Sequence, residues 1–177
     1  STTADTAPTG DGLGSYAWLL PDSIGSNVKV RISQVSDGTV VDTSNLPFTI
    51  KGSLTITAPD GSEAWGIATS QTITWNKTGT LTGNLKLEYS IDGGATYPAG
   101  QLISNTVAVA TACTGNSCSY AWTVPDAPTT QGRVKVTYLN DTTVNDQSNG
   151  NFSIKGSLTM NVPNGGETWL VGESRNI

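Results

Sequence analysis

The chain has 177 residues, of which 36% are hydrophobic and 13% charged, and its formal net charge is −5. This length allows a sizeable core in one large or nearly two small domains, without help from metals or several disulfides. The acidic balance argues against a nucleic-acid partner. The lack of a long apolar run argues against membrane insertion of this segment. Because histidine is absent, the chain also lacks the commonest general base and metal ligand.

The first residues, STTADTAPTG, lack the charged start and apolar stretch of a secretory signal, which indicates a mature or internal piece of a protein. Two later segments recur at an offset of about 104 residues: SYAWLLPD (15–22) returns as SYAWTVPD (119–126), and FTIKGSLTITAPDGSEAW (48–65) returns as FSIKGSLTMNVPNGGETW (152–169). A period this long indicates tandem domains rather than a short solenoid repeat.

The repeat divides the chain into one complete unit and two partial ones. We expect residues 52–155 to form a complete repeat, 1–51 to be the C-terminal part of a preceding repeat, and 156–177 to be the N-terminal part of a following one. NVKV (27–30) matches RVKV (133–136) at an offset two residues larger, so we expect one turn to have gained two residues and a later turn to have lost two, while the strands persist.

Within the complete unit, apolar residues alternate with polar ones, and no helical periodicity occurs. Such alternation predicts strands with one buried face. The residues predicted to point inward are Leu54, Ile56, Ile73, Trp75, Leu85, Leu87, Tyr89, Ile91, Leu102, Val107, Val109, Tyr120, Trp122, Val134, Val136, Tyr138, Phe152 and Ile154. Turn residues separate about seven such strands, so we predict an all-β fold of tandem immunoglobulin- or fibronectin-like β-sandwich repeats.

A carboxylate pair, Asp60 and Glu63, lies in APDGSEAW, and its counterparts in the next copy are Asn164 and Glu167. Paired carboxylates can bind calcium or perform acid–base catalysis. The alternative is that PDG forms a turn whose hydrogen bonds the glutamate accepts. The asparagine in the later copy favours this structural role, because it shows that the charge is not strictly required.

SIDGGATY (90–97) fits the Asp-box of sialidases, with Tyr97 in place of a tryptophan. It follows a predicted strand directly, so we expect a hairpin turn in which Gly93 and Gly94 supply positive φ and Asp92 caps backbone amides. In a propeller such boxes recur in every blade, whereas the complete unit has one. The stretch therefore predicts a turn rather than a catalytic site.

The segment QLISNTVAVAT (101–111) is uncharged, free of proline and rich in β-formers. Edge strands are normally protected by charge, proline or bulges. We therefore consider this segment a candidate lateral contact with another copy, made through Val107 and Val109. The alternative is that the segment folds back and covers its own sheet.

The only cysteines are Cys113 and Cys118. A metal site normally needs four ligands, and no histidine is present to complete one. We therefore predict a local disulfide, which would stabilise the fold by about 2 kcal/mol on the loop-entropy estimate and suit an oxidising, extracellular compartment. We expect no metal, no cofactor and no catalytic residues, since no nucleophile–base pair stands out.

Five motifs are distributed along nearly the whole length of the repeat, namely TITW (72–75), KLEYSIDGG (86–94), SYAWTVPD (119–126), GNFSI (150–154) and, from the following copy, GSLTMNVPNGGETW (156–169). Together they resemble the Ser-Thr-rich glycosylphosphatidylinositol-anchored membrane protein domain, a family that also includes yeast cell-wall β-1,6-glucan assembly proteins and large microbial surface proteins. The resemblance implies an extracellular, non-catalytic β-sandwich that often occurs in tandem.

We expect a structural or adhesive repeat of a large secreted or surface-anchored protein, forming a semi-rigid stalk, sheath or filament with copies of itself or neighbouring repeats as partners. The joint Lys155-Gly156 contains no flexible linker, which favours limited hinge motion. The alternative is a glycan-binding or cell-wall assembly accessory module, for which Trp65, Tyr97 and Tyr138 are the candidate contacts with cell-wall or surface glycans.

Overall fold

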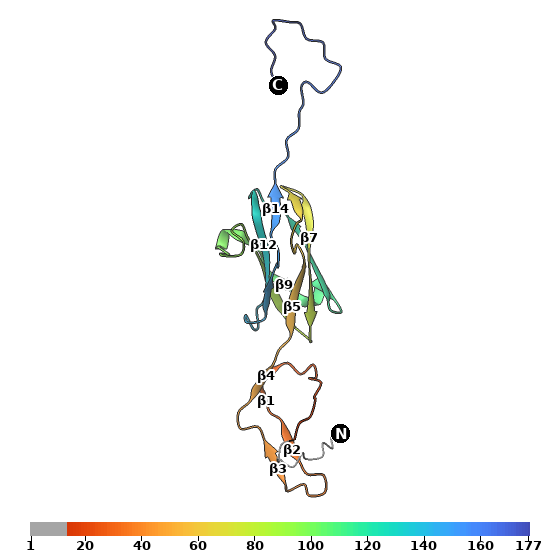
Figure 1. The fold of residues 1–177 in the computed structure, drawn as a ribbon, viewed down its shortest axis with the longest axis vertical. Helices are drawn as coiled ribbons and strands as arrows, with labels where there is room; N and C mark the ends of the chain where they lie inside the picture. The colour runs from red at the N-terminus through yellow and green to blue at the C-terminus, as the bar shows by residue number, and fades with distance from the viewer. Residues whose placement is uncertain (1–13) are drawn as a thin grey trace. The chain divides into compact units, whose positions relative to one another are not determined.

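The structure, a computed structural model, describes residues 14–177. These residues form two compact units, of which the first ends at Gly52 and the second begins at Ser53 (Figure 1). The first thirteen residues of the predicted partial repeat 1–51 lie outside the described residues.

The described residues of the first unit, 14–52, form four short strands in two antiparallel pairs. β1 (Gly25–Val28) pairs with β4 (Phe48–Ile50), and β2 (Arg31–Ser33) pairs with β3 (Val41–Thr43). Most of its large apolar side chains are exposed, namely Tyr16, Trp18, Leu19, Leu20, Ile24, Val30, Ile32, Val35, Val40, Val41 and Leu46. Its described residues therefore do not close a core of their own.

The second unit contains two sheets and two short helical turns. The four-stranded sheet has the order β10-β11-β7-β5, with β5 (Ser53–Ala58), β7 (Ser70–Thr78), β10 (Cys113–Thr114) and β11 (Ser117–Thr123). The six-stranded sheet has the order β6-β14-β12-β8-β9, with β13 also paired to β12; its strands are β6 (Ala64–Gly66), β8 (Asn84–Ser90), β9 (Leu102–Ala108), β12 (Thr129–Tyr138), β13 (Asn145–Gln147) and β14 (Phe152–Lys155). The helical turns are η1 (Ala99–Gln101) and α1 (Val109–Ala112).

This strand order is that of an immunoglobulin-like β-sandwich. Immunoglobulin domains arrange strands A, B, E and D on one sheet and C, F and G on the other. Across the sheets, β5, β7, β11 and β10 take the places of A, B, E and D, while β8, β12 and β14 take those of C, F and G. β9 adds a strand beside β8, and β6 pairs in parallel with β14. The predicted fold class is confirmed.

The inner faces of both sheets carry the alternating apolar residues of the sequence. The largest fully buried side chains are Trp75, Phe152, Ile56, Ile73, Leu85, Leu87, Ile154, Val124, Val134 and Val136. Among the predicted inward residues, Ile91 is exposed where β8 has already ended in a turn, and Leu102 and Tyr120 are half-buried.

Aromatic rings connect the two sheets. Trp65 on β6 lies 5.9 Å from Trp122 on β11 and 5.1 Å from Phe152 on β14, measured between ring centroids. Tyr89 on β8 lies 5.3 Å from Trp122. The described strands carry no disulfide between β7 and β12, where antibody domains join strands B and F. The aromatic side chains therefore occupy the space between the sheets.

The β2–β3 hairpin of the first unit has the same pairing register as the β12–β13 hairpin of the second, with residue numbers that differ by 104 on both strands. Arg31 pairs with Thr43 in β2 and β3, as Lys135 pairs with Gln147 in β12 and β13. The sequence match of NVKV to RVKV instead predicts a register in which the partner of Thr43 lies two residues from Arg31. A shift of two residues keeps every side chain on its own face, so alternation alone does not distinguish the two registers.

Residues 156–177 form no strand or helix. The apolar side chains that this segment shares with the start of the complete repeat are exposed, namely Leu158, Met160, Val162, Trp169, Leu170 and Val171. It does contain one ordered local feature, the turn around Glu167 described below.

Candidate functional site

SIDGGATY forms a hairpin turn closed by its own side chains. Gly93 and Gly94 have φ of 76° and 86°. The Ser90 hydroxyl donates to Asp92 Oδ1 and accepts from the Gly94 amide at 3.0 Å. Thr96 donates its amide to Asp92 Oδ1 at 3.0 Å and its hydroxyl to Oδ2 at 2.6 Å. The prediction of a turn is confirmed, and the Asp92 carboxylate is fully engaged within it.

These contacts lower the pKa of the Asp92 carboxyl to about 2, chiefly through the Ser90 hydroxyl and then through the donors of Thr96. A carboxyl with so low a pKa is already deprotonated at neutral pH and has no proton to donate, and its carboxylate is a weak base. This electrostatic environment suits a structural cap rather than a catalytic group.

Tyr97 lies against the outer face of the six-stranded sheet. The Lys135 ammonium lies 5.3 Å from the centre of its ring, and its hydroxyl donates to Gln147 Oε1 at 2.9 Å. Burial, as the largest cause, raises the pKa of the Tyr97 hydroxyl to about 12, so the ring stays neutral. The side chain is half-buried. Tyr97 therefore joins its loop to β12 and β13.

Trp65 and Tyr138 are not surface aromatics, which corrects their interpretation as glycan contacts. Trp65 is buried between Trp122 and Phe152. Tyr138 is buried at the end of β12, where its hydroxyl donates to the Thr82 carbonyl at 2.7 Å. A buried ring cannot stack on a sugar, so Tyr97 is the one predicted glycan contact that stays partly accessible.

The predicted lateral contact residues are also core residues. Val107 and Val109 are buried, and Val107 pairs with the fully buried Leu85 across β8 and β9. The segment therefore covers its own sheet, as in the alternative considered for it. β9 does lie at the edge of the sheet, but its pairing with β8 is interrupted by two register shifts. Such irregularities bend an edge strand and discourage further pairing.

Glu63 closes the PDG turn at the start of the complete repeat. Its Oε1 accepts from the Asp60 amide at 2.9 Å, and its Oε2 accepts from the Gly61 amide at 2.8 Å. Glu167 accepts from the Asn164 and Gly165 amides, each at 2.8 Å, in the later copy. The structural role expected for the glutamate is confirmed, and these contacts lower the pKa of Glu167.

Asp60 binds a different segment, the loop that precedes β14. Its carboxylate accepts from the Asn149 amide at 2.5 Å and from Asn149 Nδ2 at 3.1 Å. The Asp60 carbonyl accepts from the Gly150 amide at 2.8 Å. The two backbones approach so closely that a Cβ on Gly150 would lie 2.7 Å from the Asp60 oxygen. The first turn of the repeat is thus fixed to its last loop.

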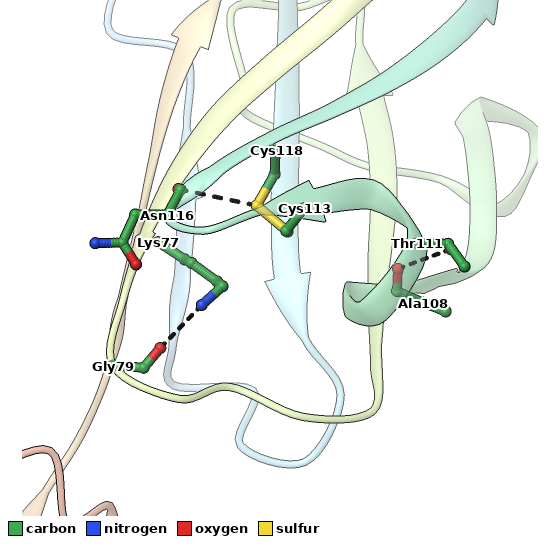
Figure 2. The surroundings of a disulfide bond; sticks show 7 residues. All are labelled: Lys77, Gly79, Ala108, Thr111, Cys113, Asn116 and Cys118. Carbon is green, nitrogen blue, oxygen red and sulfur yellow. Dashed lines mark hydrogen bonds between the residues drawn. A yellow bond between two sulfur atoms is a disulfide. The ribbon is translucent and has the colours of Figure 1, made fainter.

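Cys113 and Cys118 form the predicted disulfide, which joins β10 to β11 (Figure 2). The two residues face each other across the pair, with Cα atoms 4.0 Å apart. Cys118 is buried and pairs on its other side with Trp75 of β7. The bond therefore holds the shortest strand of the four-stranded sheet against the core.

Asp146 on β13 makes a hydrogen bond to β5 that the sequence did not reveal. Its carboxylate accepts from the Ile56 amide at 2.7 Å, on the edge of β5 away from β7. The contact joins residues 90 positions apart. Only the paired sheets bring them together, so no local pattern could have indicated it.

The remaining chemistry of the described residues is sparse. Among residues 14–177 no group of three or more His, Cys, Asp or Glu side chains could hold a metal ion. A shallow depression of about 310 Å³ lies on the outer face of the four-stranded sheet, lined by Thr57, Thr74, Trp75, Asn76, Ser117, Cys118 and Ser119. Its polar lining of hydroxyls and one amide can hold water but offers no charged group or activated nucleophile. No helix in the described part of the chain is long and apolar enough to span a membrane.

No family model and no curated protein matches the chain. Among solved structures it is similar to a chimeric titin Z1Z2 functionalised with a KLER peptide from decorin, with 13% identity and a TM-score of 0.35 over 61% of this chain and 100% of that chain. It is also similar to the titin domains Z1Z2 in complex with telethonin, with 14% identity and a TM-score of 0.33 over 62% of this chain and 51% of that chain. At these scores the assignment of the fold rests on the strand order of the chain itself.

The close approach of Gly150 to the PDG turn predicts a cost for any side chain there. Gly150→Ala is expected to lower the free energy of unfolding by roughly 1–3 kcal/mol, because two backbone segments must separate to admit the methyl group. Urea denaturation measures the change. Gly100→Ala is the matched control, since a Cβ at Gly100 meets nothing within 4 Å. Equal stability of the two variants would contradict the packing described.

The lowered pKa of Asp92 predicts an acid-dependent contribution to stability. A carboxyl whose pKa falls on folding stabilises the protein above its unfolded value near 3.8, and this contribution is lost as the pH falls toward about 2. Asp92→Asn is therefore expected to be less stable than the wild type at pH 7, with the difference disappearing near pH 2. Denaturation between pH 2 and 7 tests this, with the exposed Asp126→Asn as control; a difference independent of pH contradicts it.

The disulfide closes a short loop, so its loss is expected to destabilise the second unit by about 2 kcal/mol. Cys113→Ala combined with Cys118→Ala, or reduction of the wild type, should give the same lowering in urea denaturation. Reductant should have no effect on the double variant. A wild type whose stability is unchanged by complete reduction would show that the bond does not stabilise the fold.

Proposed function

We propose that this chain is a structural, non-catalytic repeat segment of a large secreted or surface-anchored protein in which such sandwiches follow one another in tandem. The observation that carries the proposal is a contrast in burial between copies. Several large apolar side chains that are buried in the second unit have counterparts that are exposed in the two flanking copies.

Tryptophans give the clearest contrast. Trp169 is 39% exposed, whereas its counterpart Trp65 is 8% exposed. Trp18 is 45% exposed, whereas its counterpart Trp122 is 7% exposed. A large exposed apolar surface normally marks a contact with another part of a protein. The flanking copies are therefore best understood as parts of further sandwiches of the same kind.

The joints between copies are short and alike. β4 ends at Ile50 and β5 begins at Ser53, with Lys51 and Gly52 between them. Their counterparts in the next copy are Lys155, the last residue of β14, and Gly156. Joints without a flexible linker restrict hinge motion. We propose on this basis a semi-rigid stalk, sheath or filament.

An extracellular location is part of the proposal. It is supported by the disulfide, which suits an oxidising compartment, and by the resemblance of the repeat motifs to surface-protein domains. The alternative of a glycan-binding module is weaker, because two of its three aromatic contacts are buried.

Completing the third copy tests the proposal. Ile177 aligns with Ile73, so residues 74–155 can be appended after Ile177 in the phase of the repeat. We expect the lengthened chain to form a second complete sandwich, in which amides of 157–171 become protected from hydrogen exchange. Negative-stain images should then show two adjacent domains with a narrow range of angles.

The control appends residues 74–155 directly after Gly156, which omits the first strands of the repeat and should leave the added part unfolded. Unprotected amides in 157–171 of the lengthened chain would contradict the tandem repeat. A full range of angles between two folded domains would contradict only the semi-rigid joint.

A further inference from the structure

The two outer faces of the second unit differ in charge. The outer face of the six-stranded sheet carries charged side chains, among them Lys86, Glu88, Arg133 and Lys135. On the four-stranded sheet, the outward positions of β5 and β11 are serines, threonines and one alanine, and those of β7 are Ser70, Thr72, Thr74, Asn76 and Thr78. These three strands therefore present a face of hydroxyl groups, without charge, around a single asparagine.

That asparagine begins one of three Asn-x-Ser/Thr triplets in the chain, which are Asn76-Lys77-Thr78, Asn140-Asp141-Thr142 and Asn151-Phe152-Ser153. The triplet is the acceptor pattern for an N-linked glycan. The pattern alone does not distinguish the three asparagines, but their side-chain contacts do.

Two of the three carboxamides already bond other parts of the fold. Asn140 Nδ2 donates to the Thr82 carbonyl and to the Tyr138 hydroxyl, each at 3.1 Å, so both of its hydrogens are in use. Asn151 Oδ1 accepts from Arg133 Nε at 2.7 Å. A sugar on Asn140 would therefore displace an existing hydrogen bond, and one on Asn151 would be attached to a carboxamide that already holds an arginine.

Asn76 differs from both. Its side chain is exposed near the end of β7, and its carboxamide makes no hydrogen bond to any residue in the described part of the chain. Ser117 lies directly opposite on β11, and Ser119 is the next outward residue; among residues 14–177 neither hydroxyl has a partner. Opposite residues of an antiparallel pair have Cβ atoms about 4.5–5.5 Å apart. Three unengaged polar side chains thus point outward close together.

These three side chains line the depression of about 310 Å³ described above. Small-molecule sites begin near this volume, at roughly 300 Å³. The neighbouring Thr57 and Thr74 hydroxyls bond each other at 2.7 Å, and the lining contains no charged side chain. A sugar ring can therefore exchange hydrogen bonds with the two serines without burying a charge.

We propose that Asn76 carries an N-linked glycan whose first sugar lies in this depression, against Ser117 and Ser119. The donor is an oligosaccharide attached through its C1 to a lipid diphosphate. An N–C bond forms between Asn76 Nδ2 and that C1, the C1–O bond breaks, the lipid diphosphate leaves, and one amide proton is released. The inference rests on the extracellular location proposed above, because proteins receive such glycans on their way out of the cell.

The position of the triplet in β7 determines when transfer occurs. Asn76 pairs with Ser117 on one side and with Thr55 on the other, and Thr78 Oγ1 accepts from the Ser53 amide at 3.0 Å. A transferase that recognises both the asparagine and the threonine hydroxyl cannot reach them once these pairings are complete. Transfer therefore precedes folding, and the folded sheet leaves the attached sugar on its outer face.

Mass spectrometry of the protein isolated from the cells that make it tests the modification. The tryptic peptide 52–77 contains no other asparagine, so fragmentation should place an N-linked sugar on Asn76. In the same cells, Asn76→Gln and Thr78→Ala should lose the glycan, whereas Thr78→Ser, which keeps the hydroxyl, should retain it. An unmodified Asn76, or sugar found only on the serines and threonines of this peptide, overturns the inference.

Surface labelling of intact cells separates this result from the proposed function. An unmodified Asn76 in surface-labelled protein overturns the glycan and leaves the extracellular location standing. Protein that is labelled only after the cells are lysed contradicts the extracellular location, and the glycan with it.

Thermal unfolding tests the contact with the depression. With its glycan trimmed to the first sugar, the chain should unfold roughly 4 °C above the chain produced without a glycan, which is the shift expected for one added hydrogen bond in a domain of this size. Ser117→Ala combined with Ser119→Ala should abolish this shift. Thr123→Ala is the matched control, since it lies on the same face of β11 outside the depression and should keep the shift. Equal unfolding temperatures with and without the sugar overturn its placement in the depression.

Discussion

The packing of Trp65 on Trp122 and Phe152 is the interaction on which the sandwich depends. Trp122 belongs to the four-stranded sheet, while Trp65 and Phe152 belong to the six-stranded one. No disulfide crosses between the sheets, because the cysteine bridge joins neighbouring strands of one sheet. Apolar burial and ring contacts therefore hold the layers together, and truncating one such ring typically costs about 3–5 kcal/mol. Gly132 belongs to this arrangement, since a Cβ there would lie 2.8 Å from the Phe152 ring.

Alternation in the sequence predicted the inner faces of the strands because burial on one face follows directly from the pleat. Ile73, Trp75 and Val134 are buried as expected. Tyr138 is buried as its inward position in the alternation predicted, so Trp65 and Tyr138 are both unsuitable as the glycan contacts considered for the alternative function. Whether an aromatic residue near a strand end is covered depends on distant segments: Trp65 meets Trp122, and the Tyr138 hydroxyl meets a carbonyl 56 residues away. The register of the β2–β3 hairpin was predicted two residues away from the observed one, because a shift of two residues leaves every side chain on the same face of the sheet.

The edges of the second unit are protected in different ways. On β5, the Ile56 amide donates to the Asp146 carboxylate. The strands β6 and β10 are very short, and the pairing of β9 with β8 is irregular. Proteins use each of these devices to prevent unwanted strand addition.

The turn closed by Glu63 and Glu167 has a consequence for biosynthesis. Its hydrogen bonds span three residues or fewer, and it forms equally in a copy whose strands are absent. Contacts this local need no loop closure, so they form far faster than pairings between distant strands. On the ribosome each repeat can therefore set the direction of its first strands as they emerge, before the last strand of the same repeat has been translated.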